Sequence, residues 1–455
     1  MPVKIDYVGS QLILPKIECD CGMPHDVPDI DIYIGSNIVK DCVEFIGKRN
    51  FGRNAVLVAD NITYPLAGEL VERLLTQAGY HISLCLLERE GVLEPDEAAL
   101  GEILYAMERQ TDFLIAVGSG SINDLTRYVA VMTGKPFVSV GTAASMDGYT
   151  SVVSPLLNKG LKVHKPGVYP KVLICDLEIM RNAPLPMSIS GFGDVLGKYI
   201  AIADWRLGRI INDEPYCPVS VDIVSQALQK CVDNMDGIKG QTTEGIQSLI
   251  EALILSGLTI LMIGNTRPVA SMEHNMAHYW EMMQLVRKVT PPSHGTAVGV
   301  ATGYMIKFFE EFLSRDFAKV DLEKVKQNRL PHEERKKLIL EKYGPQFGSA
   351  IIKENPEDFL TWEEQERRIK RVIDREAEIR RELEFLPTWS QVKAIFERLG
   401  APLSAADIGL SDSQLYDALA FGKDYRSRYT VAKTADELGI LDEIVQKVLG
   451  AYKGC

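Results

Sequence analysis

The alternation of short apolar runs with longer amphipathic stretches is the feature that most limits the fold of this chain. Strands separated by helix-like stretches in this way form a parallel sheet with crossover helices. The runs are DIYIG at 31–35, AVLVAD at 55–60, HISLCLL at 81–87, FLIAVG at 113–118 and FVSVGT at 137–142. Because strands buried on both faces are continuously apolar, runs such as AVLVA and FLIAV favour a sheet covered by helices on both sides. The sequence therefore predicts an α/β domain.

The strand signal ends near residue 185. The last two runs are SVVSP at 151–155 and KVLICD at 171–176, and helical periods dominate after NAPLPMS at 182–188. A chain of 455 residues also exceeds the roughly 250–300 residues that one hydrophobic core usually serves. We therefore expect an α/β domain over 1–185 and an all-α domain over 186–455. The charged segment at about 310–385 alternates in sign, which predicts solvated helix faces with i, i+4 ion pairs.

Composition excludes several classes of protein. A net charge of −12 without a basic stripe argues against a nucleic-acid partner. The eight cysteines include no Cys-x-x-Cys pair, and Cys19 and Cys21 lack a second pair to complete a zinc site, so we expect reduced thiols in a cytoplasmic protein. We expect no signal peptide and no membrane span, because the longest apolar run, 252–264, is shorter than the roughly 20 residues that cross a bilayer.

A strand, a turn and a helix follow one another at 113–130, the order of a phosphate-binding loop. Gly118, Ser119, Gly120 and Ser121 form the turn, and the backbone N–H groups of the following helix could receive a pyrophosphate. The third glycine of the dinucleotide-binding fingerprint is absent, since Asn123 and Asp124 stand near its place. A tight turn without a ligand explains the stretch equally well.

Polar residues also follow two other predicted strands. Asp60 ends AVLVAD, where an acid could accept a hydrogen bond from an adenosine ribose, or could merely cap the next helix. In SVGTAASMDGYTS at 139–151, small residues follow the predicted strand and leave room at the carboxyl edge of the sheet, where ligands of open α/β sheets bind. Thr142, Ser145 and Asp147 are therefore candidates for ligand contacts.

Histidines are scarce, with seven in the chain, yet His274 and His278 lie four residues apart in SMEHNMAHYW. This spacing puts both imidazoles on one face of a helix. Two polar residues on a solvated face would give the same pattern. Asp194 in SGFGDVLGKY and His294 in PPSHGTAVG supply further candidates, and one carboxylate with two imidazoles is a plausible ligand set for a divalent metal.

Taken together, these stretches resemble a known family. The order of VADNIT, VGSGSINDLTRYVA, TAASMDGYTS, VLICDL, NAPLPMSISGFGDVLGKYIAIADWRLG, EHNMAH and HGTAVG is similar to that of metal-dependent polyol dehydrogenases in the iron-containing alcohol dehydrogenase and dehydroquinate synthase-like superfamily. TAASMDG, the GFGD and DW stretches, the EHxxxH pair and RSRYT at 426–430 most resemble the sn-glycerol-1-phosphate dehydrogenases of the AraM type. The resemblance covers roughly residues 30–310 and 388–440.

The resemblance implies a Rossmann-like NAD(P)-binding domain, a helical domain of the dehydroquinate synthase-like fold, and one divalent metal. The implied metal ligands are Asp194, His274 and His294. The implied cofactor-binding residues are Asp60, Gly118, Ser119, Gly120, Ser121, Asp124, Thr142, Ser145 and Ser151. His278, Asp147 and Lys162 would act at the substrate, His278 as a proton relay.

The implied reaction is the reversible reduction of dihydroxyacetone phosphate to sn-glycerol 1-phosphate, with NAD, or possible use of NADP, by a homodimer or larger homo-oligomer. A polyol dehydrogenase without phosphate specificity, a dehydroquinate synthase-like lyase and a silent binding protein are the alternatives. Lys198 stands where alcohol-oxidising relatives have a fourth ligand, a histidine, which favours zinc or nickel over iron. Candidates for binding the substrate phosphate are Lys162, Lys198, Arg267 and Arg426.

Overall fold

The computed structural model describes residues 6–14, 19–23, 25 and 28–452. The chain divides into two compact units, the first formed by 1–195 with 219–265 and the second by 196–218 with 266–455. The sequence predicted a single domain boundary, near residue 185, between an α/β and an all-α domain. In the structure the chain leaves the first unit after residue 195 and returns to it after residue 218. It returns because the apolar helix α10 (Thr243–Ile263) packs against α5 (Leu177–Arg181) and the 3-10 turn Gly148–Thr150.

An eight-stranded sheet forms the centre of the first unit, in the order β1-β2-β3-β10-β7-β6-β4-β5. The strands are β1 (Asp6–Val8), β2 (Gln11–Ile13), β3 (Asp31–Gly35), β4 (Asn54–Asp60), β5 (His81–Leu87), β6 (Phe113–Gly118), β7 (Phe137–Gly141) and β10 (Val172–Asp176). The six strands from β3 to β5 in this order are parallel. Strand β2 pairs antiparallel with both β1 and β3. The predicted α/β class is therefore confirmed for this unit.

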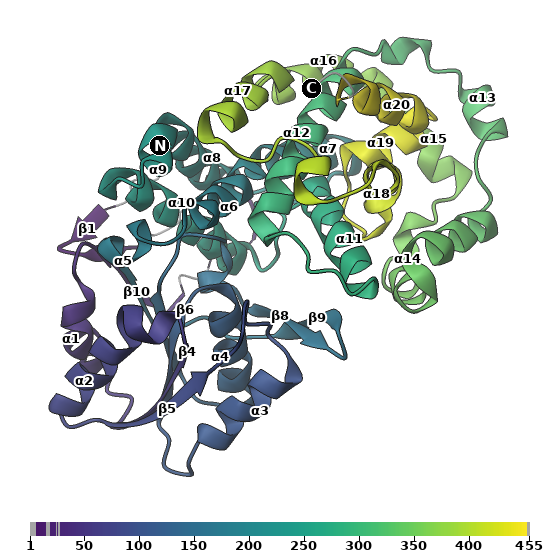
Figure 1. The fold of residues 1–455 in the computed structure, drawn as a ribbon. Coiled ribbons are helices and arrows are strands. Elements are labelled where there is room, and N and C mark those ends of the chain that lie inside the picture. Colours follow the sequence, from purple (N-terminus) through teal and green to yellow (C-terminus); the bar gives the residue numbers. More distant parts are fainter. Residues whose placement is uncertain (1–5, 15–18, 24, 26–27, 453–455) are drawn as a thin grey trace. The chain divides into compact units, whose positions relative to one another are not determined.

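Helices cover both faces of the sheet, as the apolar strands predicted (Figure 1). Leu57 and Ala59 of β4 face α1 (Cys42–Gly47) and α2 (Glu69–Gln77). Val56 and Val58 of the same strand face α3 (Glu97–Ala106) and α4 (Gly120–Thr133). Since successive strand residues point to opposite faces, the central positions of β4 must all be apolar, and residues 55–59 are all buried.

The predicted strand at 151–155 belongs to a separate hairpin. Strands β8 (Val153–Asn158) and β9 (Leu161–Pro166) pair only with each other among the described strands, in an antiparallel register that sets Leu157 opposite Lys162. Gly160 has φ of +74°, which the tight hairpin turn requires and which glycine adopts without strain.

The remaining helices of the first unit are α6 (Leu185–Leu196), α8 (Pro218–Asp233), α9 (Met235–Lys239) and α10. Helix α6 ends, and helix α8 begins, within one residue of the unit boundary. By length and apolar composition α10 could cross a membrane, with a mean hydropathy of 2.0 over its most apolar window. Because 83% of that window is buried inside the structure, α10 has the surroundings of a core helix, as predicted for 252–264.

Helices make up the second unit throughout its described part. They are α7 (Lys198–Asn212), α11 (Met272–Val286), α12 (His294–Leu313), α13 (Leu322–Gln327), α14 (His332–Glu354), α15 (Trp362–Asp374), α16 (Glu376–Leu383), α17 (Trp389–Leu399), α18 (Asp412–Phe421), α19 (Val431–Glu437) and α20 (Leu441–Tyr452). The charged segment forms α13–α16. Its predicted i, i+4 ion pairs are present, for example Lys370 with Glu366 at 2.6 Å, and α15 buries Gln365, Ile369 and Val372 along one stripe.

Candidate active-site residues in the two units

The carboxyl edge of the parallel sheet carries the residues predicted to bind the cofactor. Asp60 ends β4 and Gly118 ends β6, and these strands are neighbours in the sheet. The chain runs outward from β4 to β5 and then returns to the other side of β4 to form β6. This reversal makes the β4–β6 edge a topological switch point, the position at which open α/β sheets bind ligands.

The predicted phosphate loop is a tight connection from β6 into α4. Helix α4 begins at Gly120, and among the described residues its N-cap, Ser119, makes no side-chain capping bond to the first-turn amides. A Cβ at Gly118 would lie 2.5 Å from the side chain of Ile122, so only glycine fits the close approach of strand and helix. The amide of Thr142 donates to the Gly118 carbonyl at 3.2 Å and ties the end of β7 to this loop. The first turn of α4 is thus suited to receive an anion.

Asp60 holds the turn before the short helix at Tyr64–Gly68 and does not form the predicted helix cap, because the N-cap residue is Thr63 and, among the described residues, it makes no side-chain capping bond. Its Oδ1 accepts hydrogen bonds from the amides of Ile62 at 2.9 Å and Thr63 at 2.7 Å, while the Thr63 hydroxyl accepts from the Asp60 amide at 3.1 Å. One carboxylate oxygen is sufficient for these contacts, so they do not use the acceptor capacity of the second oxygen. A contact between Asp60 and a ribose stays a prediction.

Two of the predicted cofactor-binding residues support the loop at 148–153. Asp124 forms an ion pair with the fully buried Arg127, and Arg127 donates in turn to the carbonyl of Val153 at 3.1 Å and to that of Gly148. The Ser151 hydroxyl accepts from the amide of Val153 at 3.0 Å. These contacts give Asp124 and Ser151 a structural role, and a direct contact of either with a cofactor stays a prediction.

Asp194 is buried on α6 and accepts a hydrogen bond from the backbone amide of Asp147 at 3.1 Å. The first unit therefore brings together two residues that were predicted from separate motifs. A Cβ at Gly191 would lie 2.1 Å from the Ala144 carbonyl oxygen, which explains the first glycine of the GFGD stretch. The Ser190 hydroxyl also donates to the carbonyl of Ser145 at 3.2 Å.

The second unit brings three histidines together. His274 and His278 lie on α11, and His294 is the first residue of α12, which packs against α11. Their ring centres are 5.3 Å apart for His274 and His294, 5.3 Å for His278 and His294, and 6.3 Å for His274 and His278. The spacing of four residues places both α11 imidazoles on one helix face, as the sequence predicted, and the packing of α12 on α11 brings the third imidazole beside them.

Two buried glutamates hold these imidazoles, and sequence reasoning missed both. Glu273 Oε1 lies 2.6 Å from His274 Nδ1, while Glu281 Oε2 and Oε1 lie 3.1 Å from His278 Nδ1 and 3.2 Å from His294 Nδ1. An ionised carboxylate can only accept, so each imidazole carries its proton on Nδ1 and has a lone pair on Nε2. This is the usual arrangement of histidines that bind a metal through Nε2. Glu281 could have been found from its position three residues after His278, a spacing that places both side chains on one helix face.

The DW motif fixes the start of α11. Asp204 is fully buried, its Oδ2 accepts from the Ser271 hydroxyl at 2.7 Å, and its Oδ1 accepts from the Val431 amide at 2.7 Å. Burial raises the pKa of Asp204 to about 7, and the neighbouring Arg267 cation opposes that rise. The carboxyl group therefore joins the helix that carries His274 to the segment that follows RSRYT.

The RSRYT segment contacts the loop that leads into the same helix. Arg267 donates to both carboxylate oxygens of Glu214 at 2.8 Å and to the carbonyl of Tyr429 at 2.9 Å, and Arg428 donates to the Thr266 hydroxyl at 2.7 Å. These bonds occupy much of the Arg267 guanidinium, which fits a structural role better than the predicted contact with a substrate phosphate.

The geometry of the histidines fits a divalent ion. Two rings bound through Nε2 to one tetrahedral ion have centres about 5 Å apart, because metal–nitrogen bonds are about 2.1 Å long. The 5.3 Å separation of His274 and His294 meets this requirement. Asp194 belongs to the first unit, and its place beside the two histidines in the ligand set stays a prediction.

Replacing Glu281 by glutamine is expected to weaken metal binding by about 10- to 100-fold. Glutamine offers one accepting oxygen, so one of the two Nδ1–H groups would face an NH₂ group and its ring would turn. Isothermal titration of the metal-free protein with Zn²⁺ measures the effect. Glu311→Gln, which alters an ion pair with Lys307 further along α12, is the matched control and should leave the affinity unchanged. Equal affinities for wild type and Glu281→Gln would show that Glu281 does not orient the ligands.

Known proteins resemble this chain in sequence and in fold. The model of the iron-containing alcohol dehydrogenase family matches residues 33–184. The glycerol-1-phosphate dehydrogenase [NAD(P)+] of Halalkalibacterium halodurans is 32% identical over 424 residues, covering 92% of this chain and 96% of that protein. The protein of the same name from Bacillus licheniformis is 30% identical over 431 residues, covering 94% of each chain.

Among solved structures, a probable glycerol dehydrogenase from Sinorhizobium meliloti has the same fold, with a TM-score of 0.62 at 14% identity over 95% of this chain and 100% of that one. The predicted fold class is therefore confirmed at the level of the family as well. With nearly full-length similarity at 32% identity, the chain belongs to the glycerol-1-phosphate dehydrogenase family.

Proposed function

We propose that this protein catalyses the reversible, metal-dependent reduction of dihydroxyacetone phosphate by NAD(P)H to sn-glycerol 1-phosphate. The observation that carries the proposal is the group of three imidazoles on α11 and α12, each with Nδ1 directed at a buried carboxylate. The similarity to glycerol-1-phosphate dehydrogenases over more than nine-tenths of the chain selects this reaction among those that a metal can assist.

The proposed metal ligands are Asp194, His274 and His294. Both histidines belong to the group whose Nδ1 atoms lie against buried carboxylates, and Asp194 is a buried carboxylate in the GFGD motif of the same family. A bound Zn²⁺ or Ni²⁺ would act as a Lewis acid that polarises the substrate carbonyl and lowers the energy of the alkoxide charge. Lys198, in place of a histidine, leaves a three-residue ligand set and favours these metals over iron.

The proposed cofactor site lies along the carboxyl edge of the sheet. Gly118, Ser119, Gly120 and Ser121 would hold the pyrophosphate at the first turn of α4, because the amides and the helix dipole attract an anion. Asp60 would accept from the adenosine ribose and repel a 2′-phosphate, which favours NAD over NADP. Thr142 and Ser145, after β7, would lie on the nicotinamide side.

Three further side chains are proposed to act on the substrate. His278 donates from Nδ1 to Glu281, and its ring centre lies 5.5 Å from that of Tyr425. Because Glu281 holds the Nδ1 proton, the imidazolium form of His278 could deliver its other proton, on Nε2, to the reduced oxygen. Asp147 and Lys162 would approach the substrate from the first unit. The Lys162 ammonium is a candidate partner of the phosphate.

Comparing dihydroxyacetone phosphate with dihydroxyacetone tests the proposed substrate. A phosphate held by even one charged partner should raise kcat/KM by about 10- to 100-fold, since a hydrogen bond to a charged group contributes about 1.5–3 kcal/mol. NADH oxidation measures both rates, and NADH should disappear in a 1:1 ratio with the substrate. Equal kcat/KM for the two ketones would favour the polyol dehydrogenase alternative, and turnover without net NADH oxidation would favour the lyase.

The cellular setting is also a proposal. We expect a homodimer or larger homo-oligomer that works in the cytoplasm and supplies a phosphorylated polyol for phospholipid synthesis, without nucleic-acid or membrane partners. Its acidic composition and the burial of α10 support a soluble protein.

A further inference from the structure

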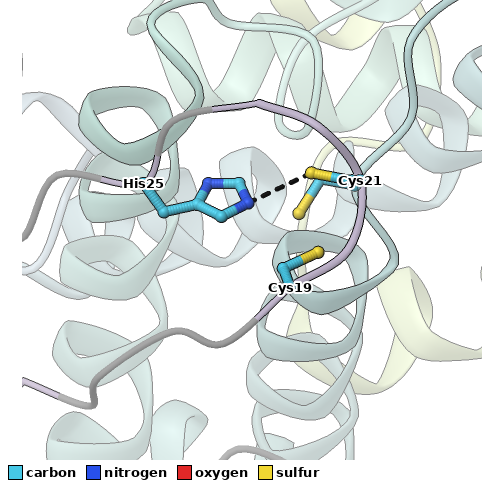
Figure 2. Close-up of side chains that lie close together, drawn as sticks. Cys19, Cys21 and His25 are labelled. Carbon is cyan, nitrogen blue, oxygen red and sulfur yellow. Dashed lines mark hydrogen bonds between the residues drawn. The ribbon is translucent and has the colours of Figure 1, made fainter.

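A second group of side chains that could hold a metal lies in the N-terminal part of the first unit, and it has no part in the proposed dehydrogenase reaction. Figure 2 shows Cys19, Cys21 and His25 turned toward one another. Their ligand atoms all lie within 4.8 Å of one another, and Cys21 Sγ is 3.1 Å from His25 Nε2. Tetrahedral Zn²⁺ has bonds of about 2.3 Å to sulfur and about 2.1 Å to nitrogen, so one ion could reach all three atoms after small side-chain shifts.

The orientation of His25 is that of a metal ligand. Its Nδ1 lies 3.4 Å from the carbonyl oxygen of Met262, near the C-terminal end of α10. A carbonyl can only accept, so the proton belongs on Nδ1 and the lone pair of Nε2 faces the thiols. Histidines that bind zinc usually donate their other N–H to a carboxylate or a backbone carbonyl in this way.

Cys19 and Cys21 differ from the cysteines of the core. Cys42 and Cys85 are buried among apolar side chains, and burial raises the pKa of their thiols to about 12 and about 11. Cys19 and Cys21 are only partly buried and lie beside an imidazole. A metal binds the thiolate, so these two thiols are much better placed to coordinate one than the core cysteines are.

We propose that Cys19, Cys21 and His25 bind a Zn²⁺ ion with a structural role, distinct from the metal of the dehydrogenase reaction. Thiolate sulfur and imidazole nitrogen are the donors that Zn²⁺ prefers, whereas Mg²⁺ and Ca²⁺ require oxygen ligands. Cysteine spacing alone predicted two reduced thiols without a metal. The histidine four residues after Cys21 supplies the additional ligand that this prediction left out.

The ion would fasten the N-terminal segment to α10. His25 already contacts the Met262 carbonyl, and Leu14 and Pro28 line a small apolar hollow together with Leu258 and Met262. Gly22 has φ of +76°, a conformation that glycine adopts easily and that turns the chain back between Cys21 and His25. Loss of zinc should therefore loosen this segment and lower the Tm of the protein.

Zinc content in a chain without the dehydrogenase site tests the proposal. The parent for this experiment is the full-length His274→Ala/His294→Ala double variant, purified with reductant and Zn²⁺ and then dialysed. We expect one zinc per chain by plasma mass spectrometry, and loss of that zinc after adding Cys21→Ser or His25→Ala. Cys85→Ala and His81→Ala, which remove a core cysteine and an exposed histidine, are matched controls and should keep it.

Cobalt substitution gives a second measurement that also works in the wild-type protein. Thiolate ligation of Co²⁺ produces a sulfur-to-metal charge-transfer band that an Asp/His/His site cannot give. We expect this band in wild type and in the double variant, and its loss in Cys21→Ser. Three results would overturn the proposal. They are a zinc content near zero in the parent, a zinc content that Cys21→Ser leaves unchanged, and recovery of Cys19 and Cys21 as a disulfide from zinc-containing buffer. None of these results depends on dehydrogenase activity.

Discussion

Alanine at His274 or at His294 lowers kcat for dihydroxyacetone phosphate reduction by at least about 10³-fold. Each change removes a proposed metal ligand, and stabilisation of the developing alkoxide by a fixed positive charge contributes several kcal/mol, while about 4 kcal/mol corresponds to 10³ in rate. NADH oxidation at saturating substrate and the metal content of the purified variants measure the effect. In the metal-free state His294→Ala should change the Tm little, because this ring is partly exposed at the start of α12. His274→Ala should lower the Tm, because it removes a hydrogen-bond partner of the fully buried Glu273 carboxylate.

The exposed His81 provides the matched control for these variants. His81→Ala, at the start of β5, should retain wild-type kcat and metal content. A His294→Ala protein that keeps its metal and more than about a tenth of the activity would remove His294 from the ligand set, since losing a true ligand costs far more.

Aspartate at Ser121 raises the KM for NADH by about 100-fold, which corresponds to about 2.7 kcal/mol of repulsion and lost contacts. Ser121 is the second residue of α4, in the turn proposed to hold the pyrophosphate. A carboxylate there would stabilise the helix itself by about 0.3–1 kcal/mol through the helix dipole. The affinity for NADH should thus fall while the Tm rises slightly. If the turn had only a structural role, the KM for NADH would not change. Steady-state kinetics and thermal denaturation measure the two effects.

The matched control places the same charge at the same position of another helix. Ala98 is the exposed second residue of α3, which has its own N-cap, Asp96. Ala98→Asp should leave the KM for NADH unchanged, and Ser121→Ala should raise it only slightly. An unchanged KM in Ser121→Asp would place the pyrophosphate away from α4.

The sequence predicted the buried strands closely and the β1–β2 edge of the sheet poorly. Strands β3 and β6 have the predicted bounds, because burial on both faces demands a continuous apolar run. Strands β1 and β2 were missed, since each has three residues and they include half-exposed positions without a clear pattern. The return of α10 to the first unit was also missed, because a helix gives no local sign of what it packs against.

For the candidate site, the sequence identified the histidines but not what holds them. His274 and His278 share a helix face, and this follows from their spacing alone. Glu281 could have been found from the same spacing, yet a glutamate on a helix usually indicates a solvated face. The bond of Arg267 to the Tyr429 carbonyl joins residues 162 positions apart, and only the tertiary structure reveals it.

NADH oxidation with dihydroxyacetone phosphate, measured on the same protein before and after metal removal, tests the proposed metal-dependent reduction most directly. We expect no oxidation after chelation and gel filtration, and recovery of the rate when Ni²⁺ or Zn²⁺ is restored, with one NADH consumed for each sn-glycerol 1-phosphate formed. Equal rates for the metal-free and the reloaded protein, or a product of the opposite enantiomer, would contradict it.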